Sequence, residues 1–212
     1  MSNKILYLGT DPSRYLHTGE LIHYPVIRTI PIPALEEAVK QAWPRVTHLI
    51  FTSPTAVKHW LSVSSFSEQK QFIAIGPATA SLLQQPLIAP FATQEGVIAL
   101  LDTLDLSCAY LLLPRSSRAR PRLTNYLQRR GIDFLAFDLY QTVPCDPGPL
   151  PEFDEIVFTS PSTVEAFLQL HGSIPRAKKV TAIGPVTKSA LPKIFEEEYT
   201  GCGKKEVNDE RR

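Results

Sequence analysis

Hydroxyl side chains recur at four turns of this sequence, and these turns are its first candidates for chemistry. Thr52-Ser53-Pro54 and Thr159-Ser160-Pro161 each follow a short apolar run, as do Gly76-Pro77-Ala78-Thr79 and Gly184-Pro185-Val186-Thr187. A helix that begins at such a turn presents unpaired peptide N–H groups and a partial positive charge, and hydroxyls add donors. The turns therefore predict binding of carboxylate or phosphate groups, and the alternative is that each hydroxyl only caps a helix. The residues assigned to this binding are Thr52, Ser53, Gly76, Thr79, Ser160, Gly184 and Thr187.

The four turns form two pairs that are separated by about half the chain. The first motif reads IFTSPTAVKHWL at Ile50–Leu61 and VFTSPSTVEAFL at Val157–Leu168, with six identities in twelve positions. The second reads FIAIGPATASLL at Phe72–Leu83 and VTAIGPVTKSAL at Val180–Leu191, with seven identities. The same order at an interval of about 107 residues indicates a duplicated unit and two small lobes.

Each motif predicts a strand, a tight turn and a helix. Thr47–Phe51 is an apolar run suited to a buried strand, after which Ser53 can cap a helix and Pro54 suits its first turn. In the second motif, the helices are expected to begin near Thr79 and Thr187. Strands that alternate with short helices predict an α/β fold with parallel sheets. Ligands of such sheets bind beyond the carboxyl ends of the strands, where all four turns would lie.

The remaining segments continue this alternation. Lys4–Gly9 and Ala109–Pro114 are expected opening strands, and Arg120–Gly131 is an expected helix that ends at its glycine. Tyr24–Pro33 and Phe134–Pro144 are extended segments that end at proline, and we interpret them as strands that also link the lobes. The charged residues 203–212 are expected to form a frayed tail.

Two further features follow predicted strands in this pattern. Arg115 is the first of four arginines after Ala109–Pro114, a cluster that is equally consistent with anion binding and with a solvated helix start. Tyr140 lies in an expected strand, where an isolated tyrosine usually packs with only its hydroxyl in water.

Composition and charge exclude several classes of protein. The formal charge is +1, from 22 basic and 21 acidic residues, so a dedicated nucleic-acid binder is not expected. Hydrophobic residues make up 43% and charged residues 20%, as in globular proteins. The apolar runs are too short to span a bilayer, and the first residues lack the pattern of a signal peptide. We therefore expect a cytoplasmic protein that does not interact with membranes.

The sequence also argues against a metal or a nucleotide cofactor. Its histidines have no metal-binding spacing, and no P-loop or GxGxxG motif opens a helix. The cysteines lie far apart, and their odd number suits a reducing compartment. They are Cys108, Cys145 and Cys202.

Six motifs in this order resemble the uroporphyrinogen-III synthase family. They are FTSPTAV (51–57), IGPATA (75–80), LLPRSSRARPRLTNYLQRRG (112–131), LYQTVP (139–144), FTSPSTVEAF (158–167) and AIGPVTKSAL (182–191). The resemblance implies a monomeric enzyme without cofactor that cyclises hydroxymethylbilane, with inversion of ring D and loss of water. It implies that Tyr140 helps the ring-A hydroxyl to leave, and that the turns bind substrate carboxylates.

The resemblance also implies two flavodoxin-like lobes joined by a two-stranded linker. One lobe would be discontinuous, with residues 1–29 and 146–212, and the other would comprise residues 35–138. Residues 30–34 and 139–145 would be the linker strands. The alternative function is a non-catalytic two-lobed module that closes on an anionic metabolite, which would use the same turns but not Tyr140.

Overall fold

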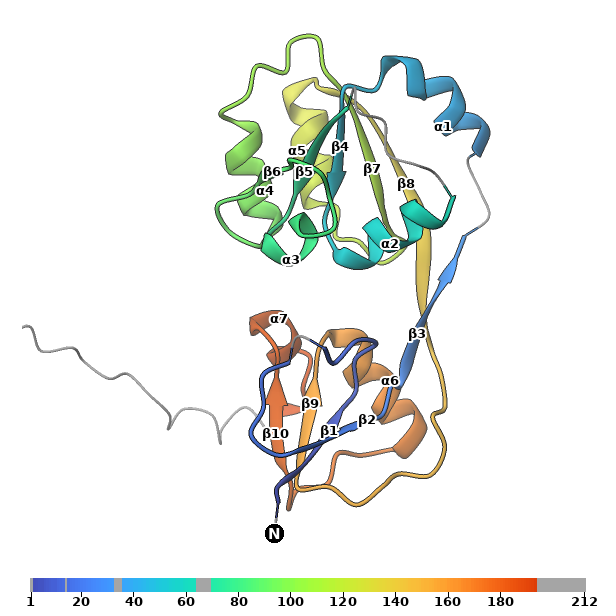
Figure 1. Ribbon diagram of the computed structural model, residues 1–212, viewed down its shortest axis with the longest axis vertical. Coiled ribbons are helices and arrows are strands. Elements are labelled where there is room, and N and C mark those ends of the chain that lie inside the picture. The colour runs from blue at the N-terminus through green and yellow to red at the C-terminus, as the bar shows by residue number, and fades with distance from the viewer. Residues whose placement is uncertain (1, 14, 33–35, 64–69, 194–212) are drawn as a thin grey trace, which may run out of the picture. The chain divides into compact units, whose positions relative to one another are not determined.

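The computed structural model describes residues 2–13, 15–32, 36–63 and 70–193, and Figure 1 shows its elements. The strands are β1 (Lys4–Tyr7), β2 (Glu20–His23), β3 (Ile27–Pro31), β4 (His48–Phe51), β5 (Gln71–Ala74), β6 (Leu87–Ile88), β7 (Tyr110–Ser116), β8 (Asp133–Pro144), β9 (Glu155–Phe158) and β10 (Lys179–Ala182). The helices are α1 (Glu36–Ala42), η1 (Trp43–Arg45), α2 (Pro54–Val63), α3 (Pro77–Ala80), α4 (Gln94–Leu101), α5 (Arg122–Arg130), α6 (Pro161–His171) and α7 (Pro185–Lys188). The expected tail at 203–212 lies outside the described residues, as do linker residues 33 and 34.

The chain divides into two compact units. Unit 1 comprises Met1–Arg28 and Val143–Arg212, and unit 2 comprises Thr29–Thr142. The two boundaries lie within strands β3 and β8, so the chain passes between the units twice, each time in extended backbone.

Unit 2 is built on a sheet with the strand order β3-β8-β7-β4-β5-β6. The neighbours from β8 to β6 pair in parallel, as the alternation of strands and helices predicted. Alternate side chains of β4 enter two cores: Leu49 and Phe51 pack with α1 and α2, whereas Ile50 packs with α4 and α5. Figure 1 shows these two pairs of helices on opposite faces of the sheet.

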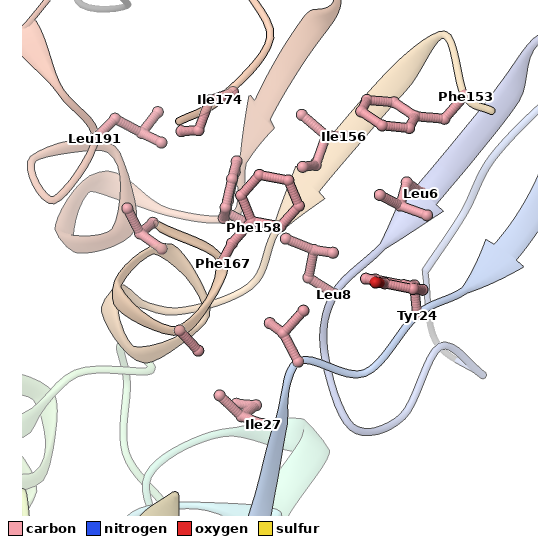
Figure 2. Close-up of a cluster of buried hydrophobic side chains, with 13 residues drawn as sticks. Leu6, Leu8, Tyr24, Ile27, Phe153, Ile156, Phe158, Phe167, Ile174 and Leu191 are labelled. Atoms are coloured by element: carbon pink, nitrogen blue, oxygen red, sulfur yellow. The ribbon is translucent and has the colours of Figure 1, made fainter. Parts of the chain in front are cut away.

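Unit 1 is built on a smaller parallel sheet with the order β10-β9-β1-β2. Read in the other direction, β2-β1-β9-β10 has the arrangement of β8-β7-β4-β5 in unit 2, with the strands of the two sequence motifs at equivalent places. Figure 2 shows the main core of unit 1, in which Phe158 of β9 lies beside Phe167 of α6, and Leu6 and Ile156 of the sheet belong to the same core.

Several expected boundaries are corrected by the structure. Helices α3 and α7 begin at Pro77 and Pro185, two residues before the expected Thr79 and Thr187, because the fixed φ of proline suits the first helical position. Strand β7 continues to Ser116, so Arg115 lies inside the strand rather than after it. Among the described residues, every helix is too short or too polar to span a bilayer.

Candidate functional site

The first motif of unit 2 places Ser53 between the carboxyl end of β4 and the start of α2. Its Oγ accepts a hydrogen bond from the peptide N–H of Ala56 at 3.0 Å, so the expected cap is present. Thr52 and Ser53 are both partly exposed at this end of the sheet. The local sequence alone determines this turn, because the buried strand ends at Phe51 and Pro54 starts the helix.

Tyr140 of β8 lies beside this turn. The Tyr140 hydroxyl is 3.1 Å from Ser53 Oγ, although 87 residues separate them. The side chain is 6% exposed. Burial raises the pKa of Tyr140 above its ordinary value of 10, and hydrogen bonds with Ser53 and Ser116 oppose that shift. The phenol therefore keeps its proton at neutral pH and can donate it.

A bulge sets the position of Tyr140 against the neighbouring strand. Arg115 of β7 pairs with Asp138, but Ser116 pairs with Tyr140, so the register shifts by one residue between them. The peptide N–H of Ser117 donates to the carbonyl of Tyr140 at 2.9 Å. Strand β8 therefore passes the candidate site, and both the backbone and the hydroxyl of Tyr140 are hydrogen-bonded there.

His59 is a site residue that the sequence analysis missed. Its ring stacks on the ring of Tyr140, with centroids 4.9 Å apart and planes inclined by 13°. Its Nε2 is 2.9 Å from Oγ1 of Thr29. Burial lowers the pKa of His59 below 6.5, so the imidazole is neutral at pH 7. One signal was available, since the other copy of the same motif, Val157–Leu168, has Ala166 at the equivalent position.

Arg115 lies at the same edge of the sheet, in an ion pair. Its Nε is 3.1 Å from Oδ1 of Asp138, and about a third of each side chain is exposed. A small pocket at this edge has Thr52, Gln94, Arg115, Arg120 and Thr124 among its lining residues. Arg122 pairs with Glu95 at 3.0 Å, outside that lining. The arginines of the predicted cluster therefore do not share one site. Arg115 lines the pocket and is also ion-paired with Asp138.

The corresponding motif of unit 1 has Ser160 at the N-cap of α6, as expected. The cap chemistry nevertheless differs from that at Ser53. Oγ1 of Thr163 accepts the peptide N–H groups of Thr159 and Ser160 at 3.1 and 3.2 Å and donates to the carbonyl of Ser160 at 2.7 Å. The start of α6 is thus a reciprocal capping box between Ser160 and Thr163, whereas unit 2, with Ala56 at the third helical position, has the serine cap alone.

The two IGP turns contain Gly76 and Gly184 for different reasons. Gly184 has φ of 84°, in the left-handed region that favours glycine. Gly76 has extended backbone, but a Cβ there would lie 2.8 Å from Cβ of Ala92. Both glycines come before one-turn helices at the carboxyl ends of β5 and β10.

Thr79 and Thr187 do not cap these helices, so the capping alternative does not apply to either. Each lies at the third helical position, and their side chains are buried, with exposures of 1% and 3%. The N–H of Thr79 donates to the carbonyl of Gly76 at 3.1 Å, so it is used within the turn. Because the prolines start the helices two residues earlier, both threonines lie within the helical turn with their side chains packed in the interior.

The structure thus brings Thr52, Ser53, Arg115 and Tyr140 to one edge of the unit 2 sheet. Ser160 and Gly184 lie at the corresponding edge of the unit 1 sheet, after β9 and β10. The fold and this arrangement define a two-unit α/β protein with parallel sheets, hydroxyl-bearing turns after the strands, and a protonated phenol beside one of these turns.

Comparisons with known proteins identify the family. A family model described as uroporphyrinogen-III synthase HemD matches residues 15–194. The chain therefore belongs to the uroporphyrinogen-III synthase family. A relative from Methanothermobacter thermautotrophicus, provisionally named uroporphyrinogen-III synthase, is 28% identical over 216 aligned positions, which cover 85% of each chain.

Two solved structures have the same fold. A mutant uroporphyrinogen III synthase of the extremely thermophilic bacterium Thermus thermophilus has a TM-score of 0.60 at 20% identity, covering 90% of this chain and 88% of that one. The uroporphyrinogen-III synthetase of Helicobacter pylori has a TM-score of 0.60 at 20% identity, covering 92% and 89%. This likeness supports the mixed α/β architecture with parallel sheets.

Proposed function

We propose that this chain is a uroporphyrinogen-III synthase, which closes linear hydroxymethylbilane into a ring with inversion of ring D and loss of water. The observation that supports this best is the buried phenol of Tyr140, 3.1 Å from Ser53 at the end of a motif strand, in a chain that belongs to this family. The reaction is a dehydration that needs an acid and a template, and it needs neither a metal nor a cofactor.

In the proposed mechanism Tyr140 is the acid. Its proton passes to the ring-A hydroxyl as the carbon–oxygen bond breaks, so that water leaves and an electrophilic azafulvenium cation remains. Ring D attacks this carbon through a spiro intermediate and is inverted before the macrocycle closes. Closure releases a proton, which restores the phenol. The chain's other task is to hold the substrate in the wrapped conformation while the uninverted closure is excluded.

Substrate carboxylates are proposed to bind at the two sheet edges. In unit 2 the ligands would be Thr52, Ser53, the turn at Gly76, and Arg115, whose Nε already holds Asp138 but whose remaining N–H groups can bind an anion. In unit 1 they would be the turns at Ser160 and Gly184. Thr79 and Thr187 then act indirectly, because their side chains are buried within the turns.

The test is an isomer analysis of the product formed from freshly prepared hydroxymethylbilane. Because this substrate also cyclises unaided, total porphyrin is not informative. We expect the chain to convert most of the substrate to the inverted isomer. A chain that binds hydroxymethylbilane without changing the isomer ratio would instead be the alternative two-lobed binding module.

Ser53→Ala is expected to weaken the reaction modestly. The change removes the cap of α2 and one partner of Tyr140, at a cost of about 1 kcal/mol, so the rate of inverted product should fall by less than about tenfold. The matched control is Thr93→Ala, which removes an equivalent cap: Oγ1 of Thr93 accepts the peptide N–H of Gly96 at 3.1 Å at the start of α4, and the rate of inverted product should match the wild type. Complete loss of activity in a folded Ser53→Ala protein would show that this hydroxyl does chemistry assigned here to Tyr140.

We also propose that the two units descend from one duplicated flavodoxin-like unit, linked by residues 30–34 and 139–145. The repeated motifs and the shared strand order support this proposal. A monomer in the cytoplasm is proposed as well. The described cysteines, Cys108 and Cys145, are both free thiols, which suits a reducing compartment.

A further inference from the structure

The ring of His59 connects the proposed acid to a third element of unit 2. One face of its imidazole stacks on Tyr140, at 4.9 Å between centroids and 13° between planes. Its Nε2 lies 2.9 Å from the hydroxyl of Thr29. Thr29 belongs to β3, His59 to α2 and Tyr140 to β8, so these contacts join three separate elements.

The strand-turn-helix motif does not itself require a histidine at this position. The equivalent residue of α6 in unit 1 is Ala166, which is 1% exposed and belongs to the core of that unit. A partly buried imidazole loses hydration, which an alanine would avoid. The histidine occurs in the copy of the motif that packs against Tyr140, so its role is better explained by the tyrosine than by the helix.

Helix α2 therefore holds the phenol at two points. Ser53, at the start of the helix, contacts the hydroxyl, and His59, almost two turns later, covers the ring face. The hydroxyl contact alone leaves the ring free to tilt about that point, whereas a flat stack restricts its plane. Tilting would displace the O–H group from the leaving hydroxyl, and a displacement of about 1 Å can cost as much as 10²-fold in rate.

We propose that His59 is a positioning residue for Tyr140: anchored by Thr29, it fixes the plane of the phenol so that the O–H group is directed at the hydroxyl that leaves. The inference rests on the proposed function, and it assigns His59 no direct contact with substrate.

The test measures kcat and KM for the inverted isomer in a set of variants. His59→Ala is expected to lower kcat about tenfold and to change KM by less than about twofold, because placement of the acid is lost and substrate binding is kept. His59→Phe, which keeps a flat ring, should restore kcat to within about threefold of the wild type. Lys58→Ala, on the exposed side of the same helix, is the control and should leave kcat unchanged.

The decisive comparison is made in the Tyr140→Phe protein. If His59 acts through the phenol, His59→Ala should cause no further loss there. A further loss of similar size would show that His59 acts on the substrate by itself, and it would overturn the inference. An unchanged kcat for His59→Ala alone would overturn it as well.

If His59→Ala does not fold, Thr29→Val provides a second test, because it removes the hydroxyl and keeps the side-chain volume. We expect it to lower kcat about threefold when Tyr140 is present, and to have no effect in the Tyr140→Phe protein. An unchanged kcat for Thr29→Val would overturn the anchoring role.

A substrate-free measurement separates this inference from the proposed function. The NMR signals of the Tyr140 ring, identified by their loss in Tyr140→Phe, are expected to shift in His59→Ala because the stacked imidazole is removed. Signals that stay in place would overturn the stack itself. Absence of inverted isomer from the wild-type chain would overturn the proposed function instead.

Discussion

Tyr140→Phe is expected to lower the rate of inverted-isomer formation about 10²-fold, because it removes the proton that assists departure of the hydroxyl. The ring and its stack with His59 remain, so packing is conserved. The lost hydrogen bond with Ser53 costs about 1 kcal/mol of stability. The ratio of inverted to uninverted isomer is the measurement, accompanied by thermal unfolding to show that the variant is folded.

The matched control for this change is Tyr126→Phe. Tyr126 is also largely buried, and its hydroxyl donates to Asp102 at 2.7 Å. Desolvation and this carboxylate raise the pKa of Tyr126 to about 12. The control thus loses a comparable hydrogen bond on α5, and its isomer ratio should match the wild type. If Tyr140→Phe formed inverted isomer at the wild-type rate, the acid role would be wrong, and the role of the chain as a conformational template would remain.

Phe158→Ala is expected to have the largest effect on stability, about 4 kcal/mol in the free energy of unfolding. Phe158 is fully buried in the core shown in Figure 2, and its ring meets that of Phe167 edge to face at 5.8 Å. It is also the last residue of β9, directly before the turn at Ser160. The substitution therefore leaves a cavity beneath a proposed binding turn.

Chemical denaturation followed by two signals can locate this effect. Both tryptophans, Trp43 and Trp60, belong to unit 2, so their fluorescence reports on that unit. Circular dichroism reports on both units, and it should show unit 1 unfolding at lower denaturant in Phe158→Ala. Phe91→Ala, at a phenylalanine that is 68% exposed, is the control and should change stability by less than about 0.5 kcal/mol. Equal stability of Phe158→Ala and wild type would contradict the packing of this core.

The local part of the fold could be predicted from the sequence, whereas the contacts across strands could not. The turn at Ser53 follows from neighbouring residues: an apolar strand, a capping serine and a proline. The contact between Ser53 and Tyr140 depends on which strands become neighbours and on the bulge at Ser116, and no periodicity in the sequence contains that information. The stack of His59 on Tyr140 was missed for the same reason.

Errors within the motifs had a different origin. The helices were expected to begin near Thr79 and Thr187, after the Gly-Pro turns, but each proline already occupies the first helical position. Thr163 was not singled out, although its hydroxyl makes the bonds at the start of α6. Residue preferences alone do not determine which residue of such a turn starts the helix or which N–H group each hydroxyl accepts.

The double passage of the chain between its units has a consequence for biosynthesis. Unit 2 is one continuous segment, so a ribosome delivers all of it before strands β9 and β10 have been made. Unit 1 needs β1 to pair with β9, for example Ile5 with Glu155, and this pairing must wait for the later part of the chain. We therefore expect unit 2 to fold first during translation. Until β9 emerges, β1 has an unpaired edge that a chaperone would have to protect.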